Sequence, residues 1–489
     1  MKNKQFKIQN LITAIFVFSL CCIHVFAQET PPKPSATKSV KIPAVQEKTL
    51  KNGLNVAVIE RKNVPLVTVE LLVKSGAQNE SMEKAGLADM TATLLTKGTA
   101  KRSATDIAEQ IEFLGGSINT GAGWNNSVVV VNVMSDKLDK ALDIMSDAVL
   151  NPAFNQDEID LLKSQTQDGL AYNLTQPGFL ASYVASKYTF GEHPAGGTPA
   201  SIASMSRNDI VNFHKLNYVP SNAVLIFTGD ISAKTAQDLA EKYFGKWNGK
   251  MSGRGSGKGS GELKNSDDNM TVKRLLVVNL PNSGQAAVKY VKDLEETKRN
   301  SVDYYPASVL NSVLGGGYSS RLNQEIRIKR GLSYGAGSGF AWRASNTNFA
   351  TSTQTKNESA AEVAELVIAE INKLSDGAIP ETELNPRKSV LTGNFGRNLE
   401  TTGGLASSVA ELYSFGIPIT ALNGYMTSVQ KVSDAQIMKF AGENLKGGDI
   451  IIVGDYAKFK DDLAKRFPSM EIQVIEAGQI DLSKADLKK

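Results

Sequence analysis

The sequence predicts an α+β fold made of two similar halves, each an α/β sandwich. The first observation is a repeat: an apolar strand followed by Gly-Asp ends at residues 229–230 and again at 454–455, an offset of 225 residues. The second is a helix-start signal at Ser206 and again at Ser433, an offset of 227 residues. Nearly constant offsets across two features indicate duplication. The third observation is that strand and helix patterns are interspersed within each half.

In the first half, alternating or continuous apolar runs predict strands at residues 54–60, 66–74 and 127–134. Longer amphipathic stretches predict helices at 138–150 and 157–172. Another helix is predicted near residue 90, because apolar side chains recur at helical spacing at Leu87, Met90, Thr91, Leu94 and Leu95.

In the second half, the same patterns predict strands at 275–280, 287–291 and 348–355. Helices are predicted at 304–314, 319–329 and 358–375. Three consecutive glycines, 315–317, separate the first two of these helices and permit a tight turn or a close approach of another chain.

The first 27 residues have the pattern of a signal peptide. Three lysines precede an apolar run at 11–23 that is too short to span a bilayer, and Ala27 follows as a small residue suited to cleavage. A lipoprotein anchor at Cys21 or Cys22 is the alternative, although the preceding residues are too large for a good lipobox. We therefore expect export across the inner membrane to the periplasm.

Removal of residues 1–27 changes the chemistry of the chain. Both cysteines leave, so disulfides and thiolate chemistry are excluded from the mature chain. Three lysines and no acidic residue leave, so the formal net charge falls from +4 to +1. A chain so close to neutrality gives no reason to expect nucleic acid or an anionic membrane as a partner.

Composition divides the remaining chain into two domains. Residues 28–46 are rich in Pro and Lys and predict an extended linker, and residues 251–270 are rich in Gly and Ser and predict a flexible connection. We therefore expect an N-terminal domain at 47–250, a C-terminal domain at 271–470 and a C-terminal tail at 471–489.

Short fragments in a fixed order reveal a family resemblance. The first half contains Leu-Lys-Asn-Gly-Leu-Asn-Val at 50–56, Ala-Gly-Leu-Ala at 85–88 and Leu-Gly-Gly-Ser-Ile-Asn at 114–119. The second half contains the long match at 314–335, which begins Leu-Gly-Gly-Gly-Tyr. The chain resembles the insulinase/pitrilysin zinc peptidases, in the branch similar to mitochondrial processing peptidase, over about residues 47–470. The resemblance implies two duplicated sandwich halves of the LuxS/processing-peptidase-like metallohydrolase type.

The zinc motif of that family is degenerate in this chain. Family members carry His-x-x-Glu-His before Lys-Gly-Thr, and the three chemical positions here are Asp89, Ala92 and Thr93. Two imidazoles one helical turn apart hold zinc and the glutamate is the general base. The later helix that supplies the third ligand has no Glu at the matching place in residues 159–165. We therefore expect no catalytic residue and no metal ligand in this chain.

The resemblance implies a substrate-binding role for Arg327 and Tyr334. In such peptidases an Arg and a Tyr of the zinc-free half reach the metal site, where they hold the substrate backbone and steady the tetrahedral intermediate. The bland alternative is that Arg327 belongs to a solvated basic helix end with Lys329 and Arg330, and that Tyr334 packs.

The sequence is thus identified as a zinc-free, Arg/Tyr-bearing subunit. It would be inactive alone and would complete a periplasmic peptidase heterodimer, with zinc held by the partner subunit and a peptide as substrate. Two alternatives stay open, a structural or assembly role and a peptide-binding role, neither of which involves proteolysis.

Overall fold

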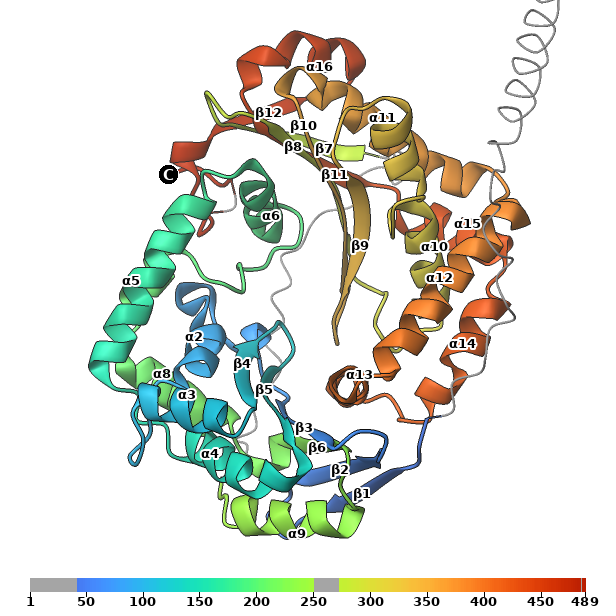
Figure 1. Cartoon of the computed structure of the whole chain (residues 1–489). Coiled ribbons are helices and arrows are strands. Elements are labelled where there is room, and N and C mark those ends of the chain that lie inside the picture. Colours follow the sequence, from blue (N-terminus) through green and yellow to red (C-terminus); the bar gives the residue numbers. More distant parts are fainter. Residues whose placement is uncertain (1–41, 250–271, 485) are drawn as a thin grey trace, which may run out of the picture. The chain divides into compact units, whose positions relative to one another are not determined.

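Two six-stranded sheets, one in each half of the sequence, form the framework of the molecule (Figure 1). The structure is a computed structural model that describes residues 42–249, 272–484 and 486–489. The predicted α+β architecture of two duplicated halves is confirmed, because the two sheets share one strand order over five of their six strands.

The first sheet has the order β1-β2-β6-β3-β5-β4, in which β2 and β6 are parallel and the other neighbours antiparallel. All seven residues of the central strand β6 are buried, which explains why its sequence is apolar without alternation. The strands are β1 (Val45–Thr49), β2 (Asn55–Glu60), β3 (Leu66–Val73), β4 (Ser117–Ala122), β5 (Ser127–Met134) and β6 (Ala223–Gly229).

The second sheet has the order β12-β7-β11-β8-β10-β9. Here β7, β11, β8, β10 and β9 take the places of β2, β6, β3, β5 and β4, with the same directions between neighbours. The strands are β7 (Val272–Asn279), β8 (Ala286–Leu294), β9 (Ala336–Trp342), β10 (Thr347–Thr355), β11 (Gly448–Gly454) and β12 (Ile472–Glu476).

The sheets differ at one edge. Strand β1 joins the first sheet antiparallel to β2, whereas β12 joins the second sheet parallel to β7. Because β12 lies within 471–489, the prediction of a tail outside the domain is wrong for this segment. Its five residues are too few to announce a strand by themselves, and pairing with a distant strand makes them one.

Helices cover both sheets, and each half has its own core on one face of its sheet. In the first half they are α2 (Leu87–Leu94), α3 (Ala104–Phe113), α4 (Leu138–Leu150), α5 (Gln156–Asn173), α6 (Pro177–Tyr188), α7 (Pro199–Ser204), α8 (Arg207–Asn217) and α9 (Ala233–Phe244). In the second half they are α10 (Tyr304–Leu314), α11 (Ala360–Asp376), α12 (Glu381–Leu399), α13 (Thr402–Ser414), α14 (Ala421–Lys431), α15 (Asp434–Asn444) and α16 (Lys460–Arg466).

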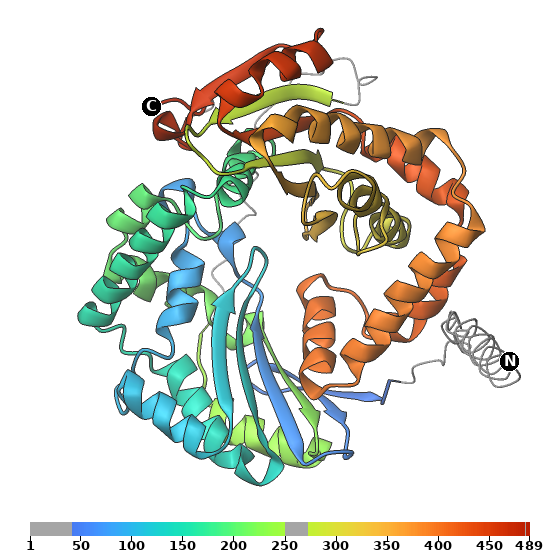
Figure 2. The same cartoon turned by 45° about the horizontal axis from the view of Figure 1, so that its top comes forward.

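The two halves exchange one helix each. Helix α6 of the first half packs on the second sheet, where Leu180 and Val184 are buried against Ile451 and its neighbours. Helix α13 of the second half packs on the first sheet, where Leu405 and Val409 are buried, and Figure 2 shows this orange helix beside the blue and cyan strands. Each sheet is therefore covered on its second face by the other half of the chain.

Some predicted segments lie outside the described residues: the signal peptide 1–27, most of the linker 28–46 and the linker 251–270. The end of the first linker belongs to the fold, since Ile42 is buried and Val45 opens β1. Within the described ranges, no helix combines the length and apolar character that crossing a membrane requires.

Candidate functional site

Helix α2 carries the degenerate motif and is held firmly at its start. Gly86 precedes the helix with a φ of 92°, a left-handed conformation that favours glycine. The Glu80 carboxylate accepts hydrogen bonds from the backbone N–H groups of Gly86 and Ala88, each at 2.7 Å. An acidic side chain at a helix N-terminus satisfies unpaired donors and complements the helix dipole.

Glu80 also faces a histidine from a distant part of the chain. Its Oε1 lies 3.6 Å from Nδ1 of His193, and both side chains are buried. Burial raises the pKa of Glu80 to about 8, against the opposing effect of the two backbone N–H groups. Burial likewise lowers the pKa of His193. Both directions favour a neutral pair near pH 7, which supports α2 without placing a metal ligand on it.

The three motif positions do not form a zinc site. Ala92 is fully buried and offers no proton acceptor, and Thr93 is half-buried with a hydroxyl only. Asp89 reaches solvent, yet the surrounding protein desolvates it enough to raise its carboxyl pKa. One carboxylate and one hydroxyl are a poor match for zinc, which prefers imidazole, thiolate and carboxylate ligands in sets of three or four.

Helix α5, where the third ligand would stand, serves packing instead. Ile159 is buried in the first core, and Lys163 Nζ donates to the carbonyls of Ala203 and Met205 at 2.9 Å. Nowhere in the described ranges do three or more His, Cys, Asp or Glu side chains gather closely enough to hold a metal ion. The residues present therefore do not fit zinc.

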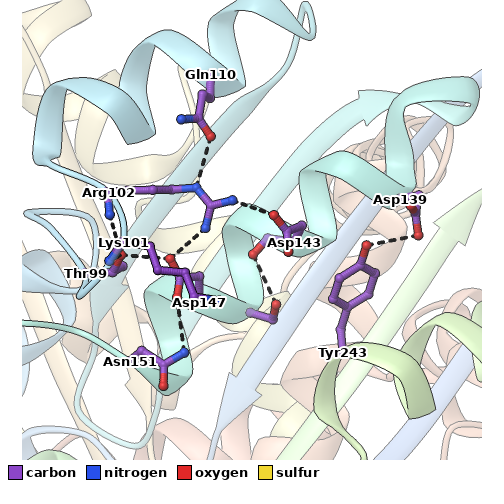
Figure 3. Close-up of polar contacts among 10 residues, drawn as sticks. Thr99, Lys101, Arg102, Gln110, Asp139, Asp143, Asp147, Asn151 and Tyr243 are labelled. Atoms are coloured by element: carbon purple, nitrogen blue, oxygen red, sulfur yellow. Dashed lines mark hydrogen bonds and ion pairs between the residues drawn. The ribbon is translucent and has the colours of Figure 1, made fainter.

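The Lys-Gly-Thr that follows α2 is tied to helix α4 by a buried ion-pair network (Figure 3). Arg102 bridges Asp147 at 2.6 Å and Asp143 at 2.5 Å, and Thr99 Oγ1 donates to Asp147 at 2.7 Å. Burial acts to raise the pKa of Asp147, but the hydrogen bonds from Thr99, Arg102 and Asn151 together lower it. The loop after α2 is thus anchored although the motif itself has lost its chemistry.

Arg327 lies in a different setting from its basic neighbours. It sits in a π-helical segment, Asn323–Lys329, a rare conformation that often marks functional sites. Lys329 and Arg330 both pair with Glu325, so the basic helix end is neutralised without Arg327. The half-buried Arg327 guanidinium lies 5.2 Å from the ring of Tyr318, and among the described residues it has no hydrogen bond or ion pair.

Tyr334 lies in the loop after the π-helical segment, and 89% of its surface is exposed. The alternative in which this ring packs is therefore wrong. The loop itself is fixed, since Leu332 N–H donates to the Ile326 carbonyl at 2.9 Å and Ala336 N–H donates to Asn323 Oδ1 at 3.4 Å. No contact joins the Arg327 and Tyr334 side chains in the described part of the chain, so both remain available.

A cleft of about 630 Å³ lies between α6 and the second sheet. Its first wall comes from the first half, with Tyr183, Phe190 and His193, and its second wall from strands β8, β9 and β10 of the second half. Neither Arg327 nor Tyr334 lines it. Sequence reasoning missed this cleft, and it also missed the Glu80–His193 pair, because the partners are more than 100 residues apart and carry no shared spacing.

Comparison with known proteins explains the arrangement. A sequence profile described as "Insulinase (Peptidase family M16)" matches residues 55–185, and one described as "Peptidase M16 inactive domain" matches residues 204–391. Together the two stretches span well over half of the chain. The chain belongs to peptidase family M16, the insulinase family.

Relatives and solved structures agree with this assignment. An uncharacterized zinc protease of Mycobacterium leprae is 26% identical over 437 residues, covering 86% of this chain and 94% of the relative. Another from Bacillus subtilis is 25% identical over 369 residues, covering 73% and 85%.

Two solved structures share the fold. The peptidase M16 inactive domain from Pseudomonas fluorescens has a TM-score of 0.74 at 24% identity and covers 84% of this chain and 98% of its own. A protease from Helicobacter pylori has a TM-score of 0.77 at 22% identity, covering 85% and 100%. At these identities the likeness establishes the M16 fold, while the site must be argued from this chain's own residues.

Proposed function

We propose that this chain is the zinc-free subunit of a periplasmic M16 peptidase heterodimer. It would contribute Arg327 and Tyr334 to the zinc site of a partner subunit. One observation carries the proposal: a guanidinium without a counter-ion and an exposed phenol stand on one ordered segment. The same chain lacks a donor set for zinc at its own motif, and residues 1–27 support export.

The two side chains suit the task chemically. A guanidinium offers a planar fork of donors for peptide carbonyls, and a phenol donates to an oxygen on which negative charge develops. Zinc bound in the partner would polarise the scissile carbonyl. The role of this chain is to bind and orient the peptide backbone, since Ala92 replaces the base that proton transfer needs.

The test uses the mature chain reconstituted with a zinc-bearing M16 subunit from the same organism. Arg327→Ala and Tyr334→Phe should each lower kcat/KM for a quenched fluorescent peptide by about a hundred- to a thousand-fold, as loss of one oxyanion donor does in other hydrolases. Zinc content and assembly should stay unchanged. Arg327→Lys should not rescue, because an ammonium lacks the planar fork.

Arg330→Ala is the matched control, because it removes a nearby positive charge that is already paired with Glu325. If Arg327→Ala and Tyr334→Phe both keep activity within about twofold, the substrate-binding role is wrong and a structural or assembly role takes its place. The mature chain alone should hold no stoichiometric zinc by elemental analysis and cleave no peptide. One tightly bound zinc with chelator-sensitive cleavage would contradict the proposal.

A further inference from the structure

Lys289 is a buried cation without a partner. It lies on the inner strand β8, where alternation places it on the same face as Ala287 and Val291, toward helix α6. Only 9% of its surface is exposed, and burial lowers its ammonium pKa. Over the described ranges its Nζ makes no hydrogen bond, ion pair or cation–π contact. An unpaired buried charge is costly, so a side chain of this kind calls for an explanation.

The duplicated half supplies a direct comparison. Lys289 pairs across the sheet with Ile451, and Glu70 pairs in the same way with Ile226, which is the residue 225 positions earlier. Glu70 and Lys289 therefore occupy equivalent places in the two sheets. Each is covered by the helix exchanged from the other half.

The two covering helices treat these charges differently. Ser407 on α13 donates to the Glu70 carboxylate at 3.1 Å, which partly offsets the burial that raises its pKa. On the other side α6 offers Lys289 no acceptor, and the space between them is the cleft of about 630 Å³. The missing acceptor is thus located in a cavity large enough for a ligand.

The surroundings of Lys289 define what the ligand must be. Aromatic residues such as Phe179, Tyr183 and Phe340 line the cleft, and strand β9 presents Gly337 and Gly339, which leave room for a chain to approach. Glu192 and Arg343, the charged pair at the rim, already bind each other. A mostly apolar ligand with one anionic group matches this lining.

We propose that the cleft binds a peptide through a carboxylate that pairs with Lys289. That the ligand is a peptide rests on the proposed function, whereas the site lies wholly within this chain. The carboxylate can be the C-terminus of the peptide or an Asp or Glu side chain, because both present the same acceptor to the ammonium.

The experiment measures binding to the isolated mature chain by fluorescence anisotropy, without any zinc subunit. The probes are a fluorescein-labelled octapeptide of alternating serine and valine with a free C-terminus, its C-terminal amide, and the amide with one central glutamate. The free acid should bind at least about tenfold more tightly than the plain amide, as a charged hydrogen bond predicts. If the glutamate amide matches the free acid, a side-chain carboxylate suffices; if it binds like the plain amide, the site selects a C-terminus.

Lys289→Met should abolish the difference between the probes, and Glu70→Gln, the equivalent position outside the cleft, should preserve it. Thermal unfolding shows whether the Met variant is folded, and loss of a buried charge should not lower its Tm. Equal binding of all three probes, or an unchanged difference in Lys289→Met, overturns the proposal. Because no zinc subunit is present, that result would leave the roles of Arg327 and Tyr334 untouched.

Discussion

At the scale of single residues, partners rather than residue types decide what each buried charge does. Glu80 and Asp147 are both buried carboxylic acids. Burial dominates at Glu80 and raises its pKa to about 8, whereas hydrogen bonds to Thr99, Arg102 and Asn151 win at Asp147 and lower its pKa. Glu80 is therefore most stable neutral, and Asp147 most stable ionised.

This difference predicts how stability responds to pH at Glu80. A carboxyl whose pKa is about 8 when folded and 4.5 when unfolded contributes stability that is full below pH 4.5 and is lost as the pH rises through about 8. Glu80→Gln cannot ionise, so it should gain stability relative to the native chain between pH 5 and pH 8.5, on the order of a few kcal/mol. Thermal melts of both proteins at the two pH values measure it.

Glu83→Gln is the control for Glu80→Gln, because Glu83 is exposed and its pKa is lowered. Its Tm difference from the native chain should be constant from pH 5 to pH 8.5. A Glu80→Gln difference equally constant across that range would show that Glu80 is ionised in the folded chain throughout.

At the scale of elements, the loop after α2 is held to α4 by Arg102. Arg102→Ala leaves Asp147, which is 4% exposed, without its cation, and breaking a buried pair in this way costs about 3 kcal/mol. Since the pKa of Asp147 is lowered in the fold, this loss should be greatest at neutral pH and shrink as the pH falls below 3.8. Urea unfolding at pH 7 and pH 3 measures it.

Lys137→Ala is the matched control, because it removes an exposed ion pair with Asp136. Surface pairs of this kind contribute about 0–1 kcal/mol, so its unfolding midpoint should barely move. The clamp has no structural weight if Arg102→Ala behaves like Lys137→Ala at pH 7.

At the scale of the whole molecule, the exchanged helices make the halves depend on each other. Helix α6 completes the second sheet and α13 completes the first, so separating the halves would expose an apolar face on each. The two sheets are therefore expected to unfold together even though each has its own core.

A specific protease site inserted after Gly259 tests this dependence. Cleavage should leave the two fragments in one complex on size-exclusion chromatography, since the exchanged helices stay in place. Leu180→Asp with Leu405→Asp puts a charge into both helix contacts, which are 2% and 1% exposed, and should release the fragments. Leu161→Asp on the exposed face of α5 should not. Separation of the cut native chain would show that the exchange does not hold the halves.

Local patterns carried much of the architecture. The strands at 127–134 and the helix at 138–150 begin and end where their apolar periodicity predicts, because side-chain spacing follows backbone geometry. The equal offsets revealed the duplication, and Asp89, Ala92 and Thr93 exposed the loss of the zinc motif without any coordinates. These features depend on residues that are near one another along the chain.

Tertiary structure alone decided the rest. The exchange of α6 and α13, the pairing of β12 with β7, and the Glu80–His193 contact join segments that share no periodicity. Whether Arg327 is paired and whether Lys289 faces an acceptor depends equally on which distant elements meet. Burial and partners arise only when the chain closes on itself, so no local pattern can report them.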